Sequence, residues 1–281
     1  MIEVLASGIY TTIQDFGRIG FQEYGVPYSG VMDRTAASLA NAILGNSPDL
    51  PVLEITMQGP KLQFQCTTTI CVTGANLSAK LNNSIFLNNK PMMVKSGDIL
   101  SFGSLKKGIR AYLAVKGGFQ TEQVMSSYSM YSGITKKEKL EKGDVLKIST
   151  ANNLVRNYNA SIKINFDYFN LKTLEVFKGP EFDMLSKKQK IQLLNTEFTI
   201  SKNNNRMAYQ LNETLQNNLK PIITSPVLPG TVQLTPSGNL IILMRDCQTT
   251  GGYPRVLQLK ESAINLIAQK YTNQPVSFQL V

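Results

Sequence analysis

The chain lacks histidine altogether, and it contains only three cysteines among its 281 residues. Without histidine it cannot build a Ser-His-Asp triad, a Cys-His pair, or a zinc or iron site that uses imidazole. Three cysteines are too few for a four-cysteine zinc site. The phosphate-binding pattern G-x-x-x-x-G-K-[ST] is also absent. Any catalysis must therefore rely on Asp, Glu, Lys, Tyr, Cys or backbone groups, and we expect no bound metal.

Long apolar runs are missing as well, since none approaches the roughly 20 residues that a membrane-spanning helix needs. The N-terminal segment carries an acid at position 3 and no basic region ahead of an apolar stretch, so it does not read as a signal peptide. An odd number of cysteines without paired spacing fits a reducing compartment. We therefore expect a cytoplasmic protein that does not enter the membrane.

Basic residues outnumber acidic ones, 29 to 19, which gives a formal net charge of +10. The lysines are scattered, often beside asparagine, and no basic cluster is interleaved with aromatic residues as in a nucleic-acid platform. This favours a solvated basic surface over nucleic-acid binding. An acidic small molecule or an acidic partner protein stays open as the reason for the charge.

Most of the chain reads as short strands separated by Gly, Asn or Pro, particularly between residues 51 and 118. A helix is predicted over 33–45, because Asp33 is a good N-cap and apolar residues recur at three- and four-residue steps. Further helices are predicted over 181–194 and 261–270. With 42% hydrophobic and 17% charged residues, the composition indicates a globular, mainly β protein with a few short helices.

An asparagine-rich segment over 149–170 interrupts the strand pattern. Such a break in composition is typical of a connection between domains. We therefore predict an N-terminal β domain over 1–155 and a C-terminal β domain over 156–281.

The stretch 11–33 combines five glycines with many polar groups and leads directly into the predicted helix. Glycines let a ligand approach the backbone, and Gln14, Asp15 and Arg18 offer donors and acceptors of both kinds. The N–H groups at the start of the helix could receive an anion, unless the Asp33 side chain caps them. An ordered structural loop is the alternative reading.

The stretch 246–255, DCQTTGGYPR, follows the apolar strand 240–245. A strand that enters a double glycine can bring backbone N–H groups together around an oxyanion. The candidate residues here are Asp246, Gln248, Thr249, Gly251, Gly252 and Tyr253. A hairpin in which the glycines only turn the chain is the alternative, but a turn does not require this set of polar side chains, so we favour a site. Arg206 is a further candidate, as an anion clamp.

These stretches resemble the carboxyltransferase-domain family, which includes the C component of 5-oxoprolinase, an antagonist of a sporulation kinase inhibitor, the second component of allophanate hydrolase and the carboxyltransferase region of urea carboxylase. The matching phrases run in family order along nearly the whole chain. They are TT-x-QD-x-GR-x-G-x-Q-x-x-G-x-P (11–27), G-x-MD (30–33), AN-x-x-x-GN (40–46), LEIT-x-x-GP (53–60), RAYLAV-x-GG (110–118), RM (206–207) and D-x-QTTGGYP (246–254). Tyr128 and Glu181 depart from the pattern, where family members often carry arginine and histidine.

The resemblance implies two cyclophilin-like β-barrel domains. It also implies one component of an ATP-dependent 5-oxoprolinase that opens the lactam of 5-oxoproline to L-glutamate together with the A and B components. Because no P-loop is present, an ATP site would be atypical or shared with a partner. Two alternatives stay open: a regulatory module that antagonises a kinase inhibitor, and a biotin-dependent carboxyltransferase acting on urea-like substrates.

Under the oxoprolinase reading we assign roles by the chemistry of the side chains. Arg18, Arg206 and the backbone at Gly251 and Gly252 would hold a carbonyl or phosphate. Asp246 and Asp15 would orient groups or shuttle protons, with Asp246, Asp15 and Arg206 as the catalytic set. The recognition groups would be Gln14, Gln248, Thr249 and Tyr253.

Overall fold

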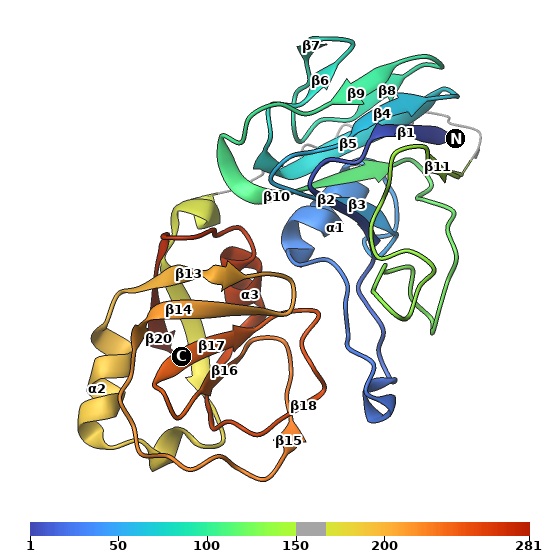
Figure 1. The fold of residues 1–281 in the computed structure, drawn as a ribbon. Helices are drawn as coiled ribbons and strands as arrows, with labels where there is room; N and C mark the ends of the chain where they lie inside the picture. The colour runs from blue at the N-terminus through green and yellow to red at the C-terminus, as the bar shows by residue number, and fades with distance from the viewer. Residues whose placement is uncertain (150–166) are drawn as a thin grey trace. The chain divides into compact units, whose positions relative to one another are not determined.

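In the computed structural model, which describes residues 1–149 and 167–281, the chain is mainly β (Figure 1). The described residues contain three α-helices, each short, alongside many strands. The predicted fold class is confirmed. The chain divides into two compact units, of which the first comprises 1–17 and 33–149 and the second comprises 18–32 and 167–281 among the described residues.

The first unit distributes its strands over two sheets. One sheet has the order β11-β1-β4-β9-β6-β7 and the other β2-β3-β10-β5-β8. The elements are β1 (Ile2–Ala6), β2 (Tyr10–Gln14), α1 (Arg34–Ile43), β3 (Val52–Thr56), β4 (Lys61–Phe64), β5 (Thr68–Asn76), β6 (Lys80–Leu81), β7 (Ser84–Ile85), β8 (Met92–Val94), β9 (Ile99–Ser101), β10 (Lys107–Val115) and β11 (Val145–Leu146).

Nearly all residues of strands β5 and β10 are buried, because both faces of their sheet are covered. Helix α1 packs on one face of these strands, and the core of the unit fills the other. The Asp33 side chain accepts a hydrogen bond from the Ala36 N–H at 3.0 Å, which confirms the predicted cap. The capping carboxylate thus occupies the place where an anion would bind.

The second unit is a closed barrel with the order β12-β19-β16-β17-β14-β13-β20. It closes through a parallel pairing of β12 with β20, whereas its other pairs are antiparallel. The elements are η1 (Gln22–Tyr24), η2 (Asp167–Asn170), β12 (Thr173–Lys178), η3 (Phe182–Met184), α2 (Lys187–Asn195), β13 (Phe198–Asn204), β14 (Ala208–Thr214), β15 (Ser225–Pro226), β16 (Thr231–Leu234), β17 (Asn239–Leu243), β18 (Thr250–Gly251), β19 (Arg255–Leu259), α3 (Glu261–Ile267) and β20 (Pro275–Leu280).

The predicted helix over 181–194 is divided in the structure. A short 3-10 turn, η3, is followed by Ser186 in extended conformation, and α2 begins only after it. Ser186 and Gln189 form a capping box, in which each side chain bonds the backbone N–H of the other residue. This cap restarts the helix, so the single long helix is wrong, whereas the helix expected over 261–270 is confirmed as α3.

The predicted domain boundary at 155/156 lies outside the described residues and stays a prediction. A single boundary does not describe the division, however, because Arg18–Met32 belongs to the second unit. Met32 is fully buried in the core of that unit, and the Ser29 N–H donates to the Arg245 carbonyl at 2.9 Å. The stretch 11–33 is thus shared between the units.

Candidate functional site

A buried ion pair lies at the C-terminal end of β17 in the second unit. Arg206, in the turn between β13 and β14, directs Nε to Asp246 Oδ2 at 2.7 Å and Nη2 to Asp246 Oδ1 at 2.9 Å. Nη2 also donates to the Gly30 carbonyl at 2.7 Å, and the Asp246 N–H donates to the Arg206 carbonyl. The exposed fractions are 6% for Arg206 and 9% for Asp246. A two-pronged, dehydrated contact of this kind fixes the orientation of both side chains.

The residues after Asp246 form a ribbon against the loop 222–227. Strand β18 pairs with β15, the Val227 N–H donates to the Thr249 carbonyl at 3.0 Å, and the Ile222 N–H donates to the Gly252 carbonyl at 2.9 Å. The double glycine therefore lies in a paired ribbon rather than a tight hairpin turn. Tyr253 is 40% exposed, so its ring is accessible to a ligand or a partner.

Gln233 of β16 occupies the space beside Gly251. A Cβ atom built on Gly251 would lie 2.5 Å from Gln233 Nε2, whereas one built on Gly252 would find only the Ile222 carbonyl oxygen at 3.4 Å. Neither glycine adopts a left-handed backbone conformation. The space for a side chain at position 251 is therefore limited by the buried Gln233 carboxamide next to it.

Gly251→Ala is expected to displace the Gln233 amide and to lower the free energy of unfolding by about 1–3 kcal/mol. Gly252→Ala, the matched control, is expected to leave stability nearly unchanged, because its new methyl group meets ordinary contact distances. Urea denaturation of both variants measures the difference. Equal losses of stability in the two variants would contradict the role of Gln233. If the contact with Gln233 is the cause, combining Gly251→Ala with Gln233→Ala should recover most of the lost stability.

Arg18 lies entirely within the second unit, at the start of its N-terminal segment. The side chain is fully buried, the N–H donates to the Tyr28 carbonyl at 2.6 Å, and the carbonyl accepts from Gln22 Nε2 at 2.8 Å. The sequence predicts that Arg18 contacts a ligand, and in the structure its side chain is enclosed by protein.

Asp15 and Gln14 lie in the first unit, at the end of β2. Asp15 Oδ1 accepts from Ser127 Oγ and Ser129 Oγ, each at 2.6 Å, and from the Gly17 N–H at 2.8 Å, while Oδ2 accepts from the Tyr128 N–H at 2.7 Å. Asp15 therefore ties the segment 127–129 to the end of β2.

Gln14 supports the same segment from the strand side. Its side chain is fully buried, and Nε2 donates to the Met130 carbonyl and to Thr12 Oγ1, both at 3.1 Å. The site residues predicted from the sequence thus fall into two groups. The structure brings Gln14 and Asp15 together in one unit, and Arg206 and Asp246 together in the other.

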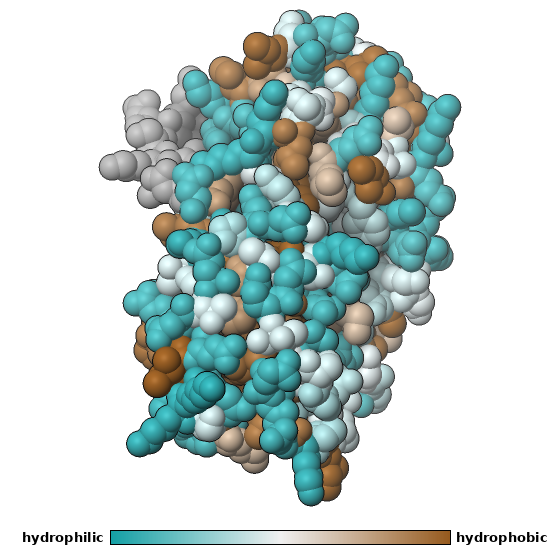
Figure 2. Space-filling model, turned by 60° about the vertical axis from the view of Figure 1, so that its left-hand side comes forward, coloured by the Kyte–Doolittle hydropathy of each residue, from teal (hydrophilic) through white to brown (hydrophobic). Residues whose placement is uncertain are grey.

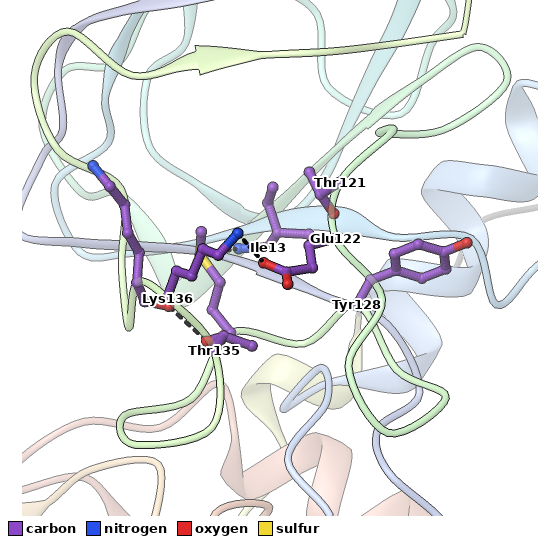
Figure 3. A pocket seen from close by; sticks show the side chains of 8 residues that line it. Ile13, Thr121, Glu122, Tyr128, Thr135 and Lys136 are labelled. Atoms are coloured by element: carbon purple, nitrogen blue, oxygen red, sulfur yellow. Dashed lines mark hydrogen bonds and ion pairs between the residues drawn. The ribbon is translucent and has the colours of Figure 1, made fainter.

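The Asp15-anchored segment forms one wall of a pocket of about 120 Å³ in the first unit (Figure 3). Its lining residues are Ile13, Thr121, Glu122, Tyr128, Met130, Thr135, Lys136 and Lys137. Of these, Tyr128 and the segment 132–140, which contains Thr135, Lys136 and Lys137, stood out in the sequence as departures from the family pattern. No local pattern showed that these residues meet, because the pocket is made by a loop that folds back on β2.

Glu181 and Arg255 form a second two-pronged ion pair that sequence reasoning missed. Arg255 Nε and Nη2 donate to Glu181 Oε2 and Oε1 at 3.0 and 2.8 Å, and Nη1 donates to the Pro226 carbonyl at 3.0 Å. The hydrogen bonds from Arg255 lower the pKa of Glu181 below its ordinary value. The pair anchors the loop that carries β15, and hence the ribbon that holds Gly251.

The two buried cysteines, Cys71 and Cys247, have thiols of low reactivity. Burial raises the pKa of the Cys71 thiol and of the Cys247 thiol to about 12, and Asp246 adds to the effect at Cys247. At neutral pH neither thiol therefore supplies a thiolate. Cys66 is half-buried.

Iodoacetamide at pH 8 is expected to label native protein only at Cys66, and denatured protein at all three cysteines, as counted by intact mass. The physical reason is that both buried thiols lack solvent access and stay protonated. A Cys66→Ser variant, which should resist labelling until unfolded, is the control. Fast labelling of native Cys247 would contradict a structural role for that residue.

Two further findings concern the described residues only. None of their helices is long and apolar enough to cross a membrane. No group of three or more His, Cys, Asp or Glu side chains in the described ranges is arranged to hold a metal ion.

Residues 24–280 match the family model of the carboxyltransferase domain, subdomain A and B. Together with the two β units and their motifs, this match shows that the chain belongs to the carboxyltransferase domain A and B family.

The chain is similar to curated proteins along its whole length. It is 30% identical to the C component of the 5-oxoprolinase of Escherichia coli strain K12, over 99% of this chain and 90% of that protein. It is 31% identical to the corresponding C component of Haemophilus influenzae 5-oxoprolinase, over 100% of this chain and 91% of that protein. A urea amidolyase of Lachancea kluyveri is 41% identical over 149 residues, which are 51% of this chain and 8% of that protein.

Solved structures share the fold. The Kluyveromyces lactis urea carboxylase superposes with a TM-score of 0.85 at 28% identity, over 99% of this chain and 27% of that chain. The crystal structure of TTHA0988 superposes with a TM-score of 0.87 at 24% identity, over 99% of this chain and 56% of that chain. This chain thus spans little more than half of the TTHA0988 chain.

Proposed function

We propose that this chain works as one component of a multi-subunit enzyme that opens 5-oxoproline to L-glutamate with ATP hydrolysis, in a complex with partners equivalent to the A and B components. The observation that carries the proposal is the end-to-end similarity to two proteins named as the C component of 5-oxoprolinase, which covers nine-tenths of each. The urea amidolyase match covers only half of this chain, so a carboxyltransferase acting on urea-like substrates ranks second. We propose a cytoplasmic location for the complex.

Asp246 is the residue of the second unit that we assign to the reaction. Arg206 holds the carboxylate in one orientation, so that it can accept a hydrogen bond from water at its remaining lone pairs. Gln248, Thr249 and Tyr253 follow on the same segment and supply recognition groups. Asp15 and Gln14 are positioning residues, because their hydrogen bonds go to the segment 127–130 of their own unit.

ATP is assigned to the complex and not to this chain alone. A triphosphate requires several cations or converging backbone N–H groups. The Tyr128 pocket is lined by two lysines, each paired with a carboxylate, and a larger pocket beside α3 is lined by Glu175 and no cation. Neither of these two pockets suits a triphosphate, which supports the proposal that a partner provides most or all of the nucleotide site.

Reconstitution with the cognate A and B components tests the proposal, with glutamate release from 5-oxoproline and ATP as the readout. The full mixture is expected to be active and this chain alone inactive. Asp246→Asn should lower kcat at least about 100-fold, the effect typical of losing a positioned carboxylate, while its one carboxamide oxygen still accepts a single hydrogen bond from Arg206. Asp183→Ala is the control, since Asp183 lies in the same unit with a side chain that is 81% exposed.

A complex that assembles but releases no glutamate would refute the oxoprolinase proposal. ATP-dependent carboxylation of urea in a mixture that contains a biotin carboxylase and a biotin carrier would favour the second candidate instead. A wild-type rate in Asp246→Asn would leave the complex as proposed and remove Asp246 from the reaction.

A further inference from the structure

The pocket beside β2 has one charged pair that is free to exchange partners. Lys136 Nζ lies 3.5 Å from Glu122 Oε2, with side chains 86% and 52% exposed. Figure 3 shows the two charged groups pointing toward each other in front of Ile13. An exposed pair of this kind contributes at most about 1 kcal/mol, so a ligand can replace it at little cost.

Lys137, the other lysine of the pocket, is held in place. Its ammonium contacts Asp144 Oδ1 at 2.6 Å and Glu141 Oε2 at 3.1 Å. These hydrogen bonds raise its pKa above the ordinary value. The pocket therefore presents one exchangeable cation, at Lys136, and one exchangeable anion, at Glu122.

The rest of the lining suits a small ligand with an apolar body. Ile13 and Met130 contribute an aliphatic and a thioether surface from β2 and from the anchored segment. The Thr121 hydroxyl is buried and makes no hydrogen bond within the described part of the chain. A buried hydroxyl without a hydrogen-bond partner destabilises the protein. A hydrogen bond from this hydroxyl to a polar atom of a ligand would remove that cost.

The wall of the pocket is preorganised. Asp15 fixes Ser127, Tyr128 and Ser129 through hydrogen bonds of 2.6–2.7 Å, so the lining residues Tyr128 and Met130 do not have to be ordered by the ligand. Ligand binding then avoids the entropy of arranging a loop. Asp15 thus positions the wall of the pocket as well as stabilising the fold.

We propose that this pocket binds a small amino acid through one of its carboxylates and one N–H group. The carboxylate pairs with Lys136, the N–H donates to Glu122, Thr121 bonds a further polar atom, and the carbon skeleton packs on Ile13 and Met130. The choice of 5-oxoproline or its product L-glutamate as the amino acid rests on the proposed function; the class of ligand rests on the pocket.

Isothermal titration of the full-length chain with 5-oxoproline, L-glutamate and L-proline tests the proposal. Binding of 5-oxoproline or L-glutamate is expected, and Lys136→Met and Glu122→Gln should each weaken it about tenfold, as expected for losing a charge-assisted contact. Lys142→Met and Glu138→Gln are the matched controls, because both residues are exposed and lie outside the pocket lining. Thr121→Val, which removes only the hydroxyl, should weaken binding by a smaller factor.

Three outcomes would overturn the proposal: no binding of any of the three amino acids at tens of millimolar, equal affinity in the pocket variants and the controls, or a reconstituted complex whose KM is unchanged in Lys136→Met and Glu122→Gln. The last result would leave the proposed function intact. Conversely, pocket-dependent binding by a chain whose complex releases no glutamate would refute the function and keep the amino-acid site.

Discussion

Arg206→Ala is expected to lower the free energy of unfolding by about 3–5 kcal/mol, because it leaves the Asp246 carboxylate buried without its counter-ion. It also removes the donor to the Gly30 carbonyl, which holds the N-terminal segment in the second unit. Urea denaturation followed by circular dichroism measures the loss. A loss of this size is a large fraction of the stability of an ordinary domain.

The neighbouring arginine provides the control. Arg245 is as buried as Arg206, but its partner Glu261 has a side chain that is 47% exposed. Arg245→Ala should therefore cost clearly less, since Glu261 can be hydrated when its partner is gone. Equal losses in the two variants would show that lost packing, and not the stranded charge, sets the effect.

A double variant separates stability from function. Arg206→Met combined with Asp246→Leu replaces the buried charges by apolar groups and should regain most of the stability lost in Arg206→Ala. The same protein should be inactive in the reconstituted complex, because the carboxylate is gone. A stable and active double variant would show that the pair serves the fold alone.

Asp15→Ala is the second change with a large expected effect, a destabilisation of about 3–4 kcal/mol. Two of the stranded donors are the hydroxyls of Ser127 and Ser129, which can rotate toward other acceptors. The other two are the backbone N–H groups of Gly17 and Tyr128, which cannot. Asp15→Asn keeps one carboxamide oxygen and should lose about half as much.

Asp98 is the comparison for Asp15, since it also accepts a backbone N–H and a side-chain donor in the same unit. Those hydrogen bonds are exposed to water, so Asp98→Ala should change stability much less. Thermal unfolding of the three variants side by side decides the point. A loss at Asp98 as large as that at Asp15 would mean that burial of the donors is not what makes Asp15 important.

Local chemistry explains how far the sequence could predict the fold. Asp33 as a cap and the strands over 51–118 follow from patterns within a few residues, and the structure confirms them. The break at Ser186 was missed because a capping box in the middle of a polar, helix-compatible stretch looks like ordinary helix sequence. The helix over 261–270 was recognisable because apolar residues predominate in it, and the structure buries Ala263 to Ile267.

The candidate site was predictable by residue type but not by partner. Arg206 and Asp246 are 40 residues apart in sequence, and no local pattern says that they meet. The same holds for Asp15 with Ser127 and for Glu181 with Arg255, which join segments more than 70 residues apart. Only the tertiary fold reveals which polar residues bind each other and which line a pocket.

Hydrophilic and hydrophobic residues both contribute to the exposed surface of the chain. Figure 2 shows one face on which hydrophilic residues dominate and hydrophobic ones are scattered. Exposed apolar side chains such as Ile223, at 93%, Ile85, at 78%, and Tyr24, at 73%, still occur among the described residues. Isolated positions of this kind are normal on protein surfaces.

The placement of Arg18–Met32 in the second unit has a consequence for how the chain is made. A ribosome releases this segment early, but the core around Met32 and the partners Arg206 and Arg245 exist only after the last third of the chain has emerged. The second unit is therefore completed by contacts of very long sequence separation, which slow folding. A fragment that starts at residue 167 would lack a piece of its own core, so clipping that releases the C-terminal half should yield an aggregation-prone product rather than an independent domain.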